Sequence, residues 1–290
     1  MRRIGRFLAR HWVSLLVLLG MAGIWQLLSM VFTTEAAPGE PMVPGWQVIV
    51  GHTLLSLADY WQGGLGIPSV AEGAPRSYPA ALMSLLSHSF DTVLRLYTGL
   101  LLGALGGSLL GIGVSWSNWT RRTVDLPLRF LRTMPLLAMV PLFQLWFGIA
   151  FSGKVIFVAY GVGVIFFSGI VNAVGNVPQI YIDNARMLGA SRRRVYWSVI
   201  LPSIFPEMRA TILLSLGLGW AAVLGAEYLG AQSGLGYIII YAEQFAYLDR
   251  MFVVALLFVV YAMISFAIFF KLTDWMLQWT PRAGRASAVG

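Results

Sequence analysis

The sequence has 290 residues, of which 58% are hydrophobic and 11% charged, and its mean hydropathy is +0.75. Because a soluble domain of this length is far more polar, this composition excludes that class and predicts a protein that uses lipid as its solvent. There is no Cys, which excludes disulfides and thiol-based chemistry, and the net charge of +8 is distributed along the chain in a way that excludes a nucleic-acid partner.

The first predicted element is a membrane-spanning helix over about 12–32. The arginines before it and the small residues Ala36 and Ala37 after it imitate a secretory signal. A signal core is typically about 7–15 residues, shorter than this run, so we expect the helix to be retained. The segment 33–86 that follows is rich in Gly and Pro and is predicted to be an external loop, with short helical pieces around 46–62.

Five more apolar runs approach the roughly 20 residues that a helix needs to cross a bilayer. They cover about 93–115, 131–150, 154–174, 210–231 and 252–275, and the second of these contains Pro135 and Pro141. The fold class expected is therefore all-α, a polytopic membrane protein with six transmembrane helices. The domains expected are 1–32 as the tail and first helix, 33–86 as the external loop, 87–278 as a core with a cytoplasmic loop at 175–208, and 279–290 as a C-terminal tail.

The distribution of charge predicts the orientation. With the N-terminus in the cytoplasm, sixteen of the twenty Lys and Arg and four acidic residues fall inside, and four basic and seven acidic residues fall outside. Positive charge accumulates on the cytoplasmic side of membrane proteins. Both termini are therefore predicted to be cytoplasmic.

Two patterns mark the second predicted span. Asp91 and Arg95 are four residues apart with the acid first, so we expect this pair to anchor the outer end of the helix, with the Arg stem reaching to the interface. Glycines at 103, 107 and 111 recur every fourth residue and predict a close helix contact. That contact could lie within one bundle or across a dimer.

The loop 175–208 predicts two short helices joined at a tight elbow. The first covers 179–188 and ends at Gly189, and Ser191 caps the second, which runs through 192–197. We expect Pro202 and Pro206 to stop that second helix. Such an elbow is small, stiff and joined to a spanning helix at both ends, so it could transmit motion.

Three polar residues are candidates for a gate or for the lining of a translocation path: Gln144, Asn172 and Glu227. A charged carboxylate at the centre of a bilayer costs at least ~2.5 kcal/mol, so Glu227 should face protein or a wet cavity. It could serve as a gate, or as a partnered carboxylate that fixes helix packing. The two amides could instead form interhelical hydrogen bonds.

The elbow carries a family resemblance. Asp183-Asn184-Ala185, Gly189, Val199, Leu201 and Pro202 are similar in spacing to the signature loop of permease subunits of ATP-driven, binding-protein-dependent (ABC) importers. In that pattern Glu-Ala-Ala is followed by Gly, Ile and Leu-Pro, so Asp183, Asn184 and Val199 depart from it. Thr92, Arg95 and Gly99 resemble the start of the core permease domain of the same family.

Two further patterns resemble importers of taurine, aliphatic sulfonates, nitrate and related small anions. The residues that carry them are Pro135, Leu137, Ala138, Pro141, Leu142 and Trp146-Phe147-Gly148, and then Glu227, Gly234, Leu235 and Gly236. The resemblance covers roughly 88–275. It implies a type I ABC importer permease fold and alternating access.

The resemblance also implies partners and a coupling site. The partners are two ATPase subunits that hold ATP and Mg, a second permease copy in a homodimer, and a periplasmic or lipid-anchored solute-binding protein at a bacterial inner membrane. This chain would bind no cofactor or metal of its own. The residues expected to contact the ATPase are Asp183, Ala185, Arg186, Leu188, Gly189, Ala190, Ser191, Arg192, Arg193, Leu201 and Pro202.

Two other functions are alternatives to transport. An intramembrane enzyme would need a nucleophile and base, or paired carboxylates, at one depth. The three His, at 11, 52 and 88, do not lie well inside a span, and Glu227 has no acidic partner in its span, so the chain is not expected to be an enzyme. An ATP-independent channel or scaffold would leave the spacing of the loop unexplained.

Overall fold

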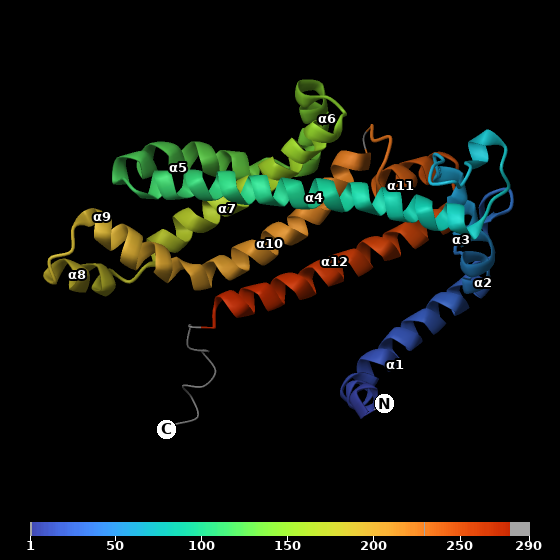
Figure 1. Ribbon diagram of the computed structural model, residues 1–290, viewed down its shortest axis with the longest axis horizontal. Coiled ribbons are helices and arrows are strands. Elements are labelled where there is room, and N and C mark those ends of the chain that lie inside the picture. The colour runs from blue at the N-terminus through green and yellow to red at the C-terminus, as the bar shows by residue number, and fades with distance from the viewer. Residues whose placement is uncertain (1, 229, 279–290) are drawn as a thin grey trace. The chain divides into compact units, whose positions relative to one another are not determined.

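The computed structural model describes residues 2–228 and 230–278, and these are mostly α-helical (Figure 1). The all-α class is confirmed. In this part of the chain the strands are two very short ones, β1 (Glu35–Ala37) and β2 (Glu40–Pro41), which pair antiparallel. The predicted tail 279–290 lies outside the described residues.

The chain divides into two compact units. The first comprises Met1–His88 and Ile238–Leu257. Besides β1 and β2 it contains α1 (Arg2–Val31), α2 (Trp46–Val48), η1 (Ile49–Thr53), α3 (Leu54–Ser56), η2 (Leu57–Tyr60) and η3 (Val70–Glu72). The short helical pieces expected around 46–62 are thus confirmed.

The segment 33–86 is held by specific contacts within the first unit. The indole of Trp46 donates a hydrogen bond to the Ala22 carbonyl of α1 at 3.0 Å. The Asp59 carboxylate forms ion pairs with Arg76, at 2.7 Å from its Nε, and with Arg250, at 3.2 Å from its Nη1. Burial raises the pKa of Tyr60 to about 12. The segment is therefore a folded structure and not an open loop.

The second unit comprises Ser89–Tyr237 and Phe258–Gly290. It contains α5 (Asn118–Thr133), α6 (Leu136–Phe147), α7 (Phe151–Asn176), α8 (Gln179–Met187), α9 (Arg192–Val195), η4 (Tyr196–Ile200) and α10 (Leu201–Tyr228). Three helices are divided between the units: α4 (Tyr78–Ser115), α11 (Leu235–Gln244) and α12 (Leu248–Met276).

Four helices in the described residues are long and apolar enough to cross a membrane. They are Tyr78–Ser115, Phe151–Asn176, Arg192–Tyr228 and Leu248–Met276. Two shorter apolar helices, Leu16–Val31 and Leu136–Phe147, correspond to the remaining two predicted spans. The count of six therefore stays a prediction, compatible with this structure. The helical structure is interrupted between α5 and α6, because Pro135 disfavours helical geometry in Met134, the residue before it.

The glycine stripe of α4 packs against α7 within the chain, which settles the alternative that the sequence left open. A Cβ added at Gly103 would lie 2.6 Å from the Ala159 carbonyl oxygen, and one at Gly111 would lie 2.9 Å from the Cβ of Ile170. Only glycine permits this approach. α7 in turn lies beside α10, and their shared core includes the fully buried Val158 (Figure 1).

Candidate functional site

α8 and α9 form the elbow that the sequence predicted, at one end of α7 and α10 (Figure 1). The Gly189 amide donates to the Arg186 carbonyl at 2.9 Å, and the Ala190 amide donates to the Ala185 carbonyl at 3.0 Å. This is the Schellman pattern, and it places Gly189 at φ +80°, a conformation that glycine adopts without strain. Both short helices are thus confirmed.

Ser191 caps α9 as expected, since its hydroxyl accepts from the Arg194 amide at 3.4 Å. The elbow is also tied to the end of α4. Arg192 donates to the Trp116 carbonyl at 2.8 Å and stacks over the Trp116 ring. Tyr196 donates to the Ile112 carbonyl at 2.8 Å. We define residues 179–202 as the coupling segment, which these contacts hold in a fixed position on the second unit.

The prediction that Pro202 and Pro206 stop the second helix is wrong. Helix runs without a break from Arg192 to Tyr228. The π-helical turn η4 ends two residues before Pro202, and the Leu201 amide closes it by donating to the Tyr196 carbonyl. A wider turn gives the proline ring more room against the preceding carbonyls than a regular α-helix does. The coupling segment is therefore continuous with the long helix α10.

The tip of the coupling segment is apolar and exposed. Met187 is 86% exposed and Leu188 is 89% exposed, beside the exposed arginines of α9. Of the residues predicted to contact an ATPase, Asp183, Arg186, Leu188, Gly189, Ser191, Arg192 and Arg193 are exposed, and Ala185, Ala190, Leu201 and Pro202 are half-buried. Leu201 and Pro202 lie at the start of α10, and the other residues of the predicted set lie on or between α8 and α9.

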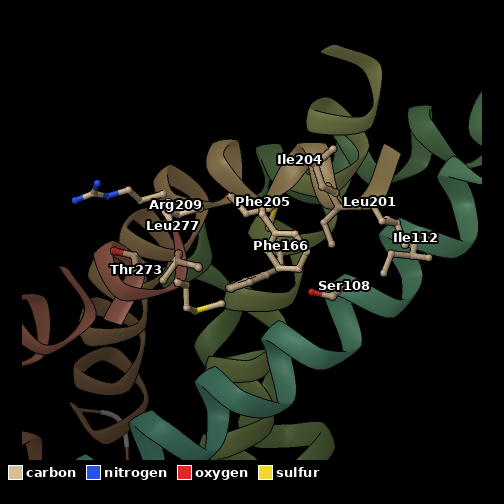
Figure 2. Close-up of a pocket in the computed structure, with 13 residues that line it drawn as sticks. Ser108, Ile112, Phe166, Leu201, Ile204, Phe205, Arg209, Thr273 and Leu277 are labelled. Carbon is tan, nitrogen blue, oxygen red and sulfur yellow. The ribbon is translucent and has the colours of Figure 1, made fainter. Parts of the chain in front are cut away.

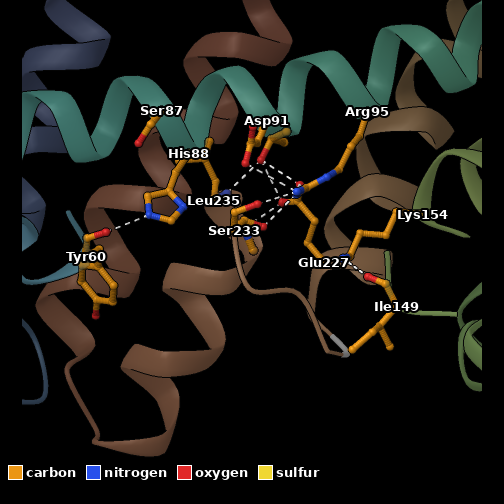
Figure 3. Close-up of polar contacts among 12 residues, drawn as sticks. Tyr60, Ser87, His88, Asp91, Arg95, Ile149, Lys154, Glu227, Ser233 and Leu235 are labelled. Atoms are coloured by element: carbon orange, nitrogen blue, oxygen red, sulfur yellow. Dashed lines mark hydrogen bonds and ion pairs between the residues drawn. The ribbon is translucent and has the colours of Figure 1, made fainter. Parts of the chain in front are cut away.

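A second group of predicted residues meets around Glu227 (Figure 3). The Glu227 carboxylate is fully buried. It accepts hydrogen bonds from the Thr92 hydroxyl at 2.8 Å, the Arg95 guanidinium at 2.5 Å and the Gly236 amide at 3.0 Å. Glu227 is thus a partnered carboxylate whose charge is offset by Arg95, and this geometry supports the packing role over an isolated gate charge.

The expected placement of Arg95 at the interface is wrong. Arg95 is only 5% exposed, and its guanidinium turns inward toward Glu227. Asp91 lies 3.6 Å from it, farther than Glu227, so the expected helical pair is the weaker of the two. The Glu227 carboxylate and the two Ser233 oxygens replace interfacial water as the partners of this guanidinium, since a buried charge is tolerated when it is paired and hydrogen-bonded.

The segment 230–236 is fastened by the same residues. Ser233 accepts from Arg95 through its carbonyl at 2.7 Å and its hydroxyl at 2.6 Å. The Leu235 amide donates to Thr92 at 2.8 Å. We call Thr92, Arg95, Glu227 and Ser233 the buried polar cluster. Sequence reasoning missed Ser233, although its place directly before Gly234-Leu235-Gly236 was a usable signal.

The two amides predicted for a translocation path lie elsewhere. Gln144 is half-buried on α6 and lines a small cavity with Lys154, whose ammonium donates to the Ile149 carbonyl at 2.5 Å. Asn172 is exposed on α7. Their roles stay predictions. Among the described residues there is also no group of three or more His, Asp or Glu that could hold a metal.

Comparison with known proteins defines the class. Residues 99–280, more than half of the chain, match the family model described as binding-protein-dependent transport system inner membrane component. The chain belongs to this family of transport permeases.

Particular relatives are transport permeases as well. The chain is 34% identical over 224 residues to the SsuC protein of Bacillus subtilis (strain 168), named for aliphatic sulfonates transport, covering 74% of this chain and 78% of that one. It is 32% identical to the taurine transport system permease protein TauC of Escherichia coli (strain K12), covering 57% and 60%. The SsuC protein of the same E. coli strain is 28% identical, covering 90% and 89%.

A solved structure supports the fold. The chain is similar to one from the inward-facing MetNI methionine ABC transporter, with a TM-score of 0.56 at 19% identity, covering 71% of this chain and 100% of that one. The predicted ABC importer permease fold is thereby confirmed.

Proposed function

We propose that this chain is the permease subunit of an ATP-driven importer that moves a small anion, with a sulfonate such as taurine first and nitrate or a similar anion next, into the cytoplasm by alternating access. Membership of the transport family supports the general role. The names of the SsuC and TauC relatives support the choice of a sulfonate. The Glu227–Arg95 pair removes one objection to an anion, because it offsets the buried negative charge.

The observation that carries the proposal is the coupling segment. Exposure of the apolar side chains at its tip, Met187 and Leu188, costs free energy in water unless a partner covers them. Large apolar side chains exposed together mark interaction sites. The Schellman elbow and the contacts to α4 hold that tip rigidly. The continuous helix from α9 into α10 then leads from the tip into the membrane. An ATPase groove that moves the tip would therefore move α10.

The assembly follows from this role. We propose that two ATPase subunits bind ATP and Mg and hydrolyse ATP, that two copies of this chain form the pathway, and that a periplasmic or lipid-anchored binding protein delivers the solute. The chain itself would hold no cofactor and catalyse no reaction. It would lie in the bacterial inner membrane with both termini in the cytoplasm, as the distribution of Lys and Arg favours.

Co-purification tests the docking surface. A tagged chain isolated from host membranes should bring an ATPase with it, and Leu188→Asp should lower the recovered ATPase activity roughly tenfold, the effect of losing about 1.4 kcal/mol of binding. Leu65 is similarly exposed, at 85% against 89%, and lies in the external segment, so Leu65→Asp is the matched control and should change nothing.

Full ATPase recovery with Leu188→Asp would remove the docking role of this tip. Activity of the isolated chain on peptide or lipid would instead favour the intramembrane enzyme.

A further inference from the structure

A cavity of about 290 Å³ lies in the second unit among α4, α7, α10 and α12 (Figure 2). It is distinct from the coupling segment's exposed tip and from the buried polar cluster. Most of its walls are apolar, and they include Ile112, Phe166, Ile204 and Met208. All four helices are ones that are long and apolar enough to cross a membrane, so the cavity lies among segments whose surroundings are lipid.

Water is a poor occupant for this cavity. A buried water needs two to four polar partners, and the polar side chains in the lining are Ser108, Arg209 and Thr273. The Thr273 hydroxyl already donates to the Phe270 carbonyl at 3.0 Å. Hydrocarbon matches the remaining walls, which carry no polar side chain.

Arg209 gives the cavity a charged rim. Its stem lines the cavity, while Figure 2 shows the guanidinium pointing away from the other lining side chains. The guanidinium lies 2.9 Å from Asp274 and 5.7 Å from the centre of the Phe270 ring, and the side chain is 37% exposed. A guanidinium has five N–H groups, so one bond to Asp274 leaves donors for a further anion. Lys271, also exposed on α12, adds a second positive charge near this end.

We propose that this cavity holds an acyl chain of an anionic phospholipid whose phosphate binds Arg209. An apolar cavity within membrane-spanning helices and a partly exposed guanidinium at its rim match the two halves of such a lipid. Basic sites between transmembrane helices recognise anionic head groups in this way. The proposal concerns a lipid site and does not depend on which solute the protein transports.

Lipid titration of the purified full-length chain with its co-purified subunits, followed by native mass spectrometry, tests the proposal. Phosphatidylglycerol should bind more tightly than phosphatidylcholine. Arg209→Gln should weaken phosphatidylglycerol binding roughly fivefold and leave phosphatidylcholine unchanged, since one basic residue contributes about 1 kcal/mol to anionic lipid binding. Arg132→Gln, which removes an exposed arginine from α5, is the matched control and should have no effect.

Two further variants extend the test beyond Arg209 itself. Asp274→Asn removes the acid that competes for Arg209 and should preserve or strengthen phosphatidylglycerol binding. Ser108→Phe places a ring in the cavity and should weaken binding of both lipids. Size-exclusion chromatography checks that each variant remains folded.

Three results would overturn the proposal. Equal phosphatidylglycerol binding by the wild type and Arg209→Gln would remove the head-group site. Binding that appears only after residues 279–290 are deleted would make that segment the natural occupant. A Ser108→Phe variant that loses association between copies, with lipid binding unchanged, would assign the cavity to a second copy of the chain.

Discussion

Glu227 has no exposed surface and lies on a membrane-spanning helix, where an isolated carboxylate costs at least ~2.5 kcal/mol. Arg95, Thr92 and the Gly236 amide supply the bonds that make this position tolerable. A Cβ added at Gly236 would lie 2.5 Å from the Cβ of Glu227, so the segment 230–236 can approach the carboxylate this closely only through glycine. The residues of the cluster therefore depend on one another.

The ion pair predicts non-additive effects on stability. Arg95→Met and Glu227→Gln should each lower the unfolding temperature in detergent, because each leaves a buried charge without its partner, a loss of about 3–5 kcal/mol. The double variant, Arg95→Met with Glu227→Gln, should recover part of the loss because no unpaired charge remains. Additive losses would show that the two side chains do not act as a pair.

Glu227→Gln also separates the two roles considered for this residue. The amide introduced at position 227 can still accept the hydrogen bond from Thr92 but carries no charge. Lower stability of this variant with unchanged uptake would therefore leave only the packing role. A change in uptake without a change in stability would support a gate.

At the scale of elements, the joint between α8 and α9 depends on one backbone conformation. Gly189 adopts φ +80°, and a Cβ there would have open space, so a substitution is opposed by backbone strain and not by crowding. Left-handed geometry costs other residues roughly 1–2 kcal/mol, with Asn an exception.

Gly189→Val should therefore distort the elbow and reduce uptake several-fold while ATP hydrolysis continues and the protein remains in the membrane. Gly189→Asn, which tolerates this conformation, should keep most of the coupling. Both quantities can be measured in proteoliposomes that contain the complete transporter. Normal uptake by the Val variant would refute the assignment of the elbow.

The long helices show how packing resolves what a sequence pattern leaves open. The glycines at 103, 107 and 111 predict a close helix contact, and the structure shows that α7 is the helix that they contact. Pro202 and Pro206 predicted an end of the helix, but the helix continues through both, and a π-helical turn ends two residues before Pro202. Proline removes a donor, and whether the chain stops there depends on how the neighbouring turns rearrange.

For the whole molecule, the orientation in the membrane is open to a direct experiment because the chain has no Cys. Single cysteines at Leu65 and at Leu188 would both be exposed, since these side chains are 85% and 89% accessible. With the chain expressed without its ATPase, a membrane-impermeant thiol reagent should label Leu65→Cys in cells whose outer membrane is permeable, and Leu188→Cys only after the inner membrane is opened. The reverse pattern would invert the proposed topology and remove the ATPase docking role.

The sequence by itself determined the membrane class, the apolar segments that correspond to the four long helices, the helical pieces within 46–62 and the elbow at Gly189. These features arise from local composition, from the length of apolar runs and from the conformational freedom of a single residue, all of which can be read within a short window. Only the tertiary structure decided four other features. They are the pairing of Arg95 with Glu227, the packing of the glycine stripe against α7, the folding of 33–86 onto α1 and Arg250, and the cavity beside Arg209. Each of these features joins side chains from segments that are distant in sequence. The hydrophobic periodicity of one segment does not indicate which other segment packs against it.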